Sequence, residues 1–108
     1  DLQRVAKLAE DELSRTRSLF EKQVVSQMEV TNAEITLKNE QIRLAEAKRN
    51  RAAIASLLAE LVALREKNLE VAKRLREKQV ATERDVGEYE KAMLEDRLRR
   101  DAAIKASK

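Results

Sequence analysis

The sequence lacks the residues on which most reaction centres and tight turns depend. It has no cysteine, proline, histidine or tryptophan, and only one glycine in 108 residues. Without histidine or cysteine the chain cannot build the zinc sites or the Ser–His and Cys–His nucleophiles that use these side chains, and it cannot form a disulfide. With one glycine and no proline, it also has little with which to make the turns of a β-rich fold.

Charge of both signs is abundant instead. Charged residues make up 40% of the chain and aromatic residues 2%, and 23 Lys and Arg against 20 Asp and Glu give a net charge of +3. A small mixed net charge provides no concentrated basic surface for nucleic acid. Neighbouring acids such as Glu95-Asp96 are common on acid-rich helices, and no cleft is indicated that would desolvate them. We therefore predict no enzyme activity, no metal, no cofactor and no nucleic-acid partner.

Apolar residues recur at alternating spacings of three and four, as in the seams of coiled coils. In the first segment the recurring positions are Leu2, Ala6, Ala9, Leu13, Thr16 and Phe20. In the middle they are Ile54, Leu57, Leu61, Leu64, Asn68, Val71 and Leu75, with Asn68 as a polar interruption. No run approaches the ~18 apolar residues of a membrane span, so we expect no direct membrane insertion. The pattern predicts an all-α, coiled-coil chain.

Two places carry start signals for a new helix. At Ser26 and Glu29 the spacing is that of a capping box, in which each side chain can bond to the other residue's backbone N–H. Thr82 and Asp85 repeat this plan. Both places belong to an internal repeat, because residues 19–30 and residues 75–86 are identical at six of twelve positions. The offset of 56 residues is eight heptads, so the seam keeps its phase.

These signals predict a long antiparallel helical hairpin of three helices, at about 1–22, 27–77 and 83–106, with two tip turns. The two arrangements that we consider differ at Asn50, the one soft spot between the tips. Residues 27–77 can form one unbroken helix with a tip at each end. Alternatively, the chain turns near Asn50 and both tips lie at the same end. We favour the unbroken helix, because the sequence shows no glycine or proline for a turn there.

The first tip has the most specific spacing in the chain: Arg15, then Leu19 four positions later, then Ser26 seven positions after that. With the flanking residues 17–26 and the Ala- and Glu-rich residues 33–51, this spacing resembles the α-helical hairpin of periplasmic adaptor proteins. These are the membrane fusion proteins of the hemolysin-D-like family. The resemblance covers about residues 5–55, and the second copy extends it in degraded form. Many tips of that family carry a glycine where Gln23 and Gln79 stand here.

The resemblance implies an architecture and partners. The 108 residues would be a single hairpin domain excised from a larger adaptor, which is anchored in the inner membrane and reaches into the periplasm. Such adaptors bridge an inner-membrane transporter to an outer-membrane channel protein in tripartite efflux pumps and type I secretion systems, and they self-associate into a ring. By the same resemblance, Arg15 is the polar contact to the channel, Leu19 the apolar contact and Ser26 the turn residue that also meets the channel. Leu75 and Thr82 stand at weaker equivalents in the second tip.

Two other functions stay open on the sequence alone. A generic coiled-coil spacer or scaffold would suit the heptads and the charge equally, although a rod has no need of capped breaks. A helical fragment of the outer-membrane channel itself is the second alternative, but its repeat is much longer than 56 residues.

Overall fold

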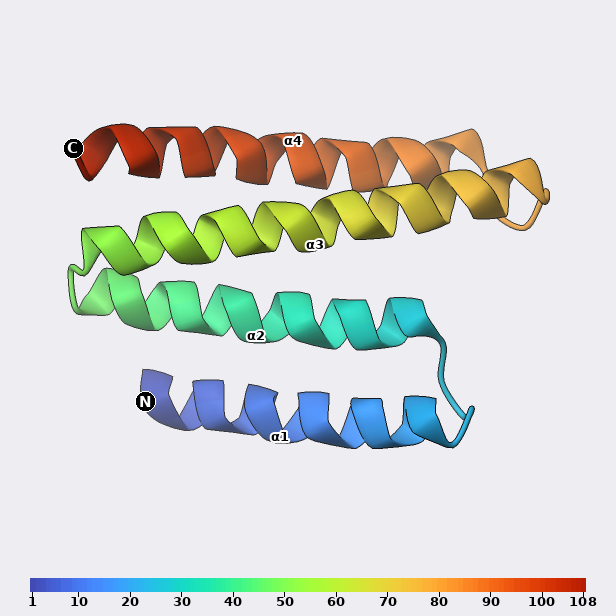
Figure 1. Ribbon diagram of the computed structural model, residues 1–108, viewed down its shortest axis with the longest axis horizontal. Coiled ribbons are helices and arrows are strands. Elements are labelled where there is room, and N and C mark those ends of the chain that lie inside the picture. The colour runs from blue at the N-terminus through green and yellow to red at the C-terminus, as the bar shows by residue number, and fades with distance from the viewer.

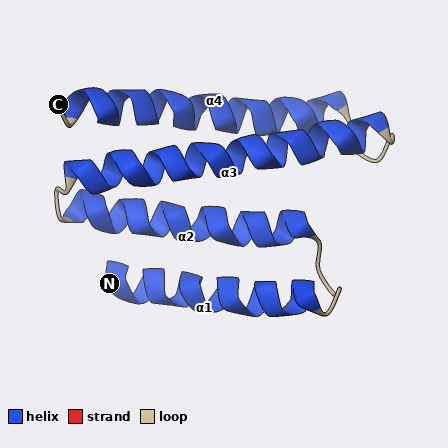
Figure 2. Cartoon of the chain, viewed as in Figure 1, coloured by secondary structure: helices blue, strands red, loops and turns tan.

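The computed structural model describes all 108 residues and contains four α-helices joined by short turns. These are α1 (Leu2–Glu21), α2 (Gln27–Ala47), α3 (Arg51–Glu77) and α4 (Glu83–Ala106). They run alternately up and down and lie side by side in chain order, with α1 and α4 at the two edges (Figure 1). Figure 2 shows that the helices are joined by short loops and turns and that the chain has no strand. The Cα atoms span 43 × 29 × 17 Å, so the chain forms a thin layer of helices.

The predicted unbroken helix over 27–77 is wrong, and so is the count of three helices. The first part ends at Ala47 and a new helix begins at Arg51. Arg49 adopts a left-handed conformation with φ 55°. The Asn50 side chain then caps α3 by accepting from the backbone N–H of Ala53 at 3.1 Å. As a result, both tips lie at the end of the layer opposite this turn, together with each other (Figure 1).

All three turns end the preceding helix in the same way, without glycine. A lysine at the helix end is followed by a left-handed residue: Gln23 (φ 62°), Arg49 (φ 55°) or Gln79 (φ 61°). In the first of them, the Gln23 N–H bonds to the carbonyl of Phe20 at 2.9 Å, and the next N–H reaches Leu19 at 2.8 Å. This pair of bonds is the Schellman motif, which satisfies carbonyls that the helix end leaves free. The turn at Arg49 is therefore stabilised by backbone hydrogen bonds, which cannot be recognised from the residue types.

The α3 helix is packed on two sides, which explains why the chain turns back at Asn50. Toward α2, Leu58 and Leu61 join Ile35 and Ile42 in one buried cluster. Toward α4, a second buried cluster consists of Leu69, Ala72, Val86 and Met93. The turn brings α2 onto α3 and removes Ile35 and Ile42 from water, where each buried side chain contributes about 1.5–3 kcal/mol. This exceeds the ~1–2 kcal/mol that a left-handed non-glycine residue costs.

The predicted seams are confirmed in part. Ala9, Leu13 and Thr16 are buried in α1, but Phe20 is 40% exposed. In α3 the seam broadens from one stripe into two faces, because the helix has a neighbour on each side. Asn68 is buried as predicted for a seam residue, at 1% exposure, and its Nδ2 donates to Asn32 Oδ1 at 2.9 Å. No helix is long and apolar enough to cross a membrane.

Candidate functional site

The first tip is a short turn between two well-defined helix ends. After Gln23 turns the chain, Val24 and Val25 lead to Ser26, whose backbone is extended with φ −83° and ψ 162°. The Ser26 hydroxyl accepts from the backbone N–H of Glu29 at 3.2 Å and so caps α2. The predicted cap is therefore confirmed, but only this half of the capping box is formed. The chain leaves α1 and enters α2 with its backbone polar groups largely satisfied.

The second tip repeats this geometry closely. Its left-handed residue, Gln79, has φ 61° against 62° for Gln23, and Thr82 is extended like Ser26, with φ −98° and ψ 167°. The Val80 N–H bonds to the carbonyl of Leu75 at 2.8 Å, as in the first tip. The 56-residue sequence repeat is thus also a repeat of structure, so that α1 and α2 form a first hairpin and α3 and α4 form a second hairpin.

The cap of the second tip is more complete than that of the first. The Thr82 hydroxyl accepts from the Asp85 N–H at 3.1 Å, and the Thr82 N–H donates to Asp85 Oδ2 at 2.9 Å. The bond from the Thr82 backbone, followed by that with its side chain, holds the pKa of the Asp85 carboxyl below its ordinary value of 3.8. The second tip is therefore closed by two reciprocal bonds, the full capping box.

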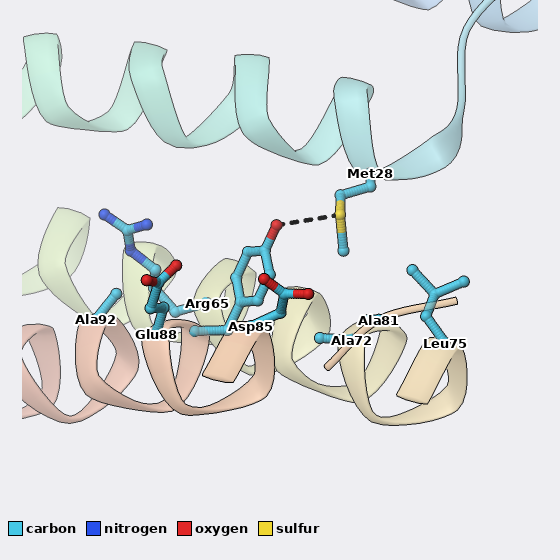
Figure 3. Close-up of a pocket in the computed structure, with 9 residues that line it drawn as sticks. Met28, Arg65, Ala72, Leu75, Ala81, Asp85, Glu88 and Ala92 are labelled. Carbon is cyan, nitrogen blue, oxygen red and sulfur yellow. Dashed lines mark hydrogen bonds between the residues drawn. The ribbon is translucent and has the colours of Figure 1, made fainter. Parts of the chain in front are cut away.

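Side chains from both hairpins meet just behind the tips. The Tyr89 hydroxyl of α4 lies 3.4 Å from the Met28 sulfur of α2, along the dashed line in Figure 3. Beside this contact is an open groove of about 360 Å³, which is bounded by Leu75 and Ala81 from the second tip and by Asp85 and Glu88 on α4 (Figure 3). The contact joins the first turn of α2 to the second turn of α4, and so links the two hairpins just behind their tips.

The structure places the predicted contact residues of the first tip on or near this surface. Arg15 is exposed and forms an ion pair with Glu12 at 3.1 Å, one helical turn back. Such an exposed pair contributes little and leaves the guanidinium able to exchange partners. Leu19 is half-buried and Ser26 is exposed. Arg15 lies on α1 about two turns before the tip, and Leu19 follows it one turn later on the same face of the helix.

In the second tip, Leu75 is half-buried and Thr82 is exposed, as their counterparts are. Both lie at the same end of the molecule as Ser26, which contradicts the favoured arrangement with opposed tips. A partner that approaches this end therefore meets both turns. No second arginine stands at the position of Arg15, because Val71 occupies it.

Sequence reasoning missed the two most exposed apolar residues at this end. Val24 is 67% exposed and Val80 is 72% exposed. Each follows the left-handed residue of its turn, at the position where a Schellman motif often carries an apolar side chain. The repeat of Gln-Val in the two tips is the signal in the sequence that could have identified them.

Comparisons with known proteins identified no relative of this chain. No protein-family model, no curated protein and no solved structure matches the chain. The resemblance to the hemolysin-D-like adaptors therefore depends on the tip residues and on the hairpin architecture.

Proposed function

We propose that this chain is the helical hairpin domain of a periplasmic adaptor, and that the end bearing both tips docks onto the periplasmic end of an outer-membrane channel. The parent protein would then be anchored at the inner membrane and would bridge a transporter to that channel in an efflux pump or type I secretion system. The observation that carries the proposal is the tip end itself, where two repeated turns present the exposed side chains of Val24 and Val80 at the same end of the layer. Arg15 is exposed on the helix that leads into the first of these turns.

The shape of the domain supports a docking role for this end. The N- and C-termini both lie at the opposite end of the layer, beside the turn at Arg49 (Figure 1). A domain that is attached to the rest of a protein at that end projects its tips outward. Short capped turns also hold the docking residues on rigid helix ends, which limits the entropy lost on binding.

The chemistry of the tips supports a helical protein partner. Val24 and Val80 are each more than 65% exposed, although apolar side chains of this kind gain by leaving water. Arg15 lies on α1 about two turns before the first of these tips, and its side chain is 70% exposed. A guanidinium can bind carboxylates and backbone carbonyls in a fork geometry, and helix ends at a channel's rim offer both.

A coiled-coil spacer is the second candidate, and the flat layer of antiparallel helices suits it. That function makes no use of the exposed valines or of the tip repeat. It therefore predicts that tip substitutions leave every interaction of the protein unchanged.

The test compares two arginines with the same local chemistry. Arg15 pairs with Glu12 and Arg43 pairs with Glu40, both at i,i+3 and both at 3.1 Å. Arg43 lies on α2 toward the turn at Arg49, away from the tips. Binding of the chain to a purified efflux-pump outer-membrane channel in lipid nanodiscs is measured by biolayer interferometry. We expect Arg15→Asp to weaken binding about tenfold or more, as for a contact worth over 1.4 kcal/mol.

Arg43→Asp should change the same affinity less than about twofold, because rim charges distant from a contact matter little. Val24→Ser and Val80→Ser, measured singly, show whether one tip or both take part. An equal loss of affinity in Arg15→Asp and Arg43→Asp would contradict the docking proposal and favour the spacer. The absence of binding to every channel of a panel would do the same.

A further inference from the structure

A single hydrogen bond joins α2 directly to α4. The Tyr89 hydroxyl donates to Met28 Sδ at 3.4 Å (Figure 3), although α3 lies between these two helices in the layer (Figure 1). Ala72 of α3 is 1% exposed and borders the groove beside this contact. Because the alanine side chain is short, the tyrosine ring can reach across α3. The thioether of Met28 is therefore one end of a contact between the two hairpins.

The two methionines of the chain differ in their access to water. Met28 is half-buried and borders the open groove of about 360 Å³ behind the tips. Met93 is 6% exposed and belongs to the buried cluster between α3 and α4. Oxidation of a methionine requires the oxidant to reach the sulfur, so a dissolved oxidant can reach Met28 in the folded chain. It can reach Met93 only when α3 and α4 separate.

The groove also provides space for the oxidised product. With hydrogen peroxide, the lone pair of the sulfur attacks one peroxide oxygen, the S–O bond forms and the O–O bond breaks. The sulfur loses two electrons, and the other oxygen leaves as hydroxide, which takes up the proton of the transferred oxygen and becomes water. The product, methionine sulfoxide, carries one additional oxygen on the sulfur. Since Met28 borders the groove, this oxygen can point into open space.

Tyr89 is the donor that is available to a sulfoxide at Met28. A thioether sulfur is a weak acceptor, whereas a sulfoxide oxygen carries partial negative charge and accepts more strongly. Arg65, the other donor that borders the groove, already bonds to Asp96 at 2.8 Å. The two carboxylates at the groove are acceptors and cannot donate to the sulfoxide. Oxidation therefore exchanges a weak acceptor for a strong one beside the same hydroxyl.

We infer that Met28 is a site of reversible oxidation, and that its sulfoxide accepts a hydrogen bond from Tyr89 and so keeps α2 linked to α4. Methionine sulfoxide is returned to the thioether by methionine sulfoxide reductases. The link between the hairpins is thus strengthened by a peroxide and reset by a reductase. This inference depends on the groove and on the contact across α3, and it does not require the proposed docking function.

The rate of oxidation tests the site. The folded chain is treated with hydrogen peroxide, and the tryptic peptides 23–38 and 92–97, which contain Met28 and Met93, are followed by mass spectrometry. Met28 should be oxidised about tenfold faster than Met93 or more, because only its sulfur borders the groove. In concentrated urea the two rates should become equal. Equal rates in the folded chain, or faster oxidation of Met93, would overturn the assignment of the site.

The bond to Tyr89 is tested by thermal unfolding in a Met93→Leu chain, in which only Met28 can be oxidised and the core volume is nearly kept. Tyr89→Phe in this chain removes the hydroxyl and keeps the ring. Oxidation should lower the Tm by about 4 °C more in the Tyr89→Phe chain than in its parent, as expected for the loss of one hydrogen bond. An equal change in both chains would contradict the bond.

A second measurement leaves the tyrosine in place. Tyr89 is the only tyrosine and the chain has no tryptophan, so the near-ultraviolet absorbance reports on this phenol. A phenol that donates to a stronger acceptor absorbs at longer wavelength. Oxidation of the Met93→Leu chain should therefore shift the absorbance to longer wavelength, and the absence of a shift would overturn the inference. The matched control has both Met28→Leu and Met93→Leu, and peroxide should change neither its spectrum nor its Tm.

Discussion

The two hairpins share one sequence plan but hold their helices together differently. The seam of the first hairpin has Ala9 at the position where the second has Arg65. In the second, Arg65 Nε lies 2.8 Å from Asp96 Oδ2, and the Asp96 side chain is 8% exposed. The counterpart of Asp96 is Glu40, which pairs only with Arg43 on its own helix. The comparison shows that the repeat preserves the turns and the helix ends, while each seam has its own chemistry.

The largest expected difference between the hairpins lies in this ion pair. Asp96→Ala leaves the Arg65 side chain, which is three-quarters buried, without its carboxylate partner. We expect a loss of about 3 kcal/mol in the free energy of unfolding. Glu40→Ala, at the equivalent position, leaves only an exposed arginine and should cost less than about 1 kcal/mol. Urea unfolding measures both, and equal losses would show that the second seam does not depend on its ion pair.

Unlike the seams, the two tip turns should respond alike to substitution. Gln23→Gly and Gln79→Gly each relieve a left-handed non-glycine residue, which costs about 1–2 kcal/mol. The greater freedom of the unfolded chain offsets about 0.4–1 kcal/mol of this gain. We expect each substitution to stabilise the protein by about 0.5–1 kcal/mol. Lys22→Gly and Lys78→Gly are the controls, because these residues have φ −87° and −86° and should show no gain.

The smallest expected difference between the hairpins is in how the free energy of unfolding changes at acid pH. The Asp85 carboxyl has its pKa lowered by its bonds to Thr82, so the unfolded chain binds protons more readily than the folded one. The stabilisation is fully present above the unfolded value, near 3.8, and is lost as the pH falls through the lower folded value. Asp85→Asn should therefore flatten the stability curve below about pH 4.

Glu29→Gln is the matched control for this experiment, because the first tip lacks the reciprocal half of its capping box. It should leave the acid part of the stability curve unchanged. An equal flattening in both variants would mean that the two caps are equivalent in solution.

Local signals in the sequence located the tips correctly. Ser26 and Thr82 are capping residues by type and by spacing, and the structure confirms both as N-caps. The twelve-residue repeat predicted that the two tips resemble each other, and their backbone angles agree closely. These features depend on hydrogen bonds between residues no more than six apart, so a short stretch of sequence is enough to predict them.

The turn at Arg49 depends on contacts that are distant in the sequence. Ile35 and Ile42 of α2 are buried only when α3 folds back on them, and a periodic pattern does not say which helix supplies the partner. One signal was available: Asn50 is a capping residue three positions before Ala53, the N–H that it binds. The exposure of Val24 and Val80 was also hidden, because periodicity does not describe side chains outside the helices.

The central claim is that both tips lie at one end of the molecule. Lys22→Cys and Lys78→Cys place spin labels at equivalent, exposed helix ends in a chain that has no other cysteine. The two labelled helices are separated by one helix, so double electron–electron resonance should give a distance of about 16–20 Å, which is two spacings of 8–10 Å each. A distance of about 70–80 Å, the length of an unbroken helix over residues 27–77 at 1.5 Å per residue, would contradict it.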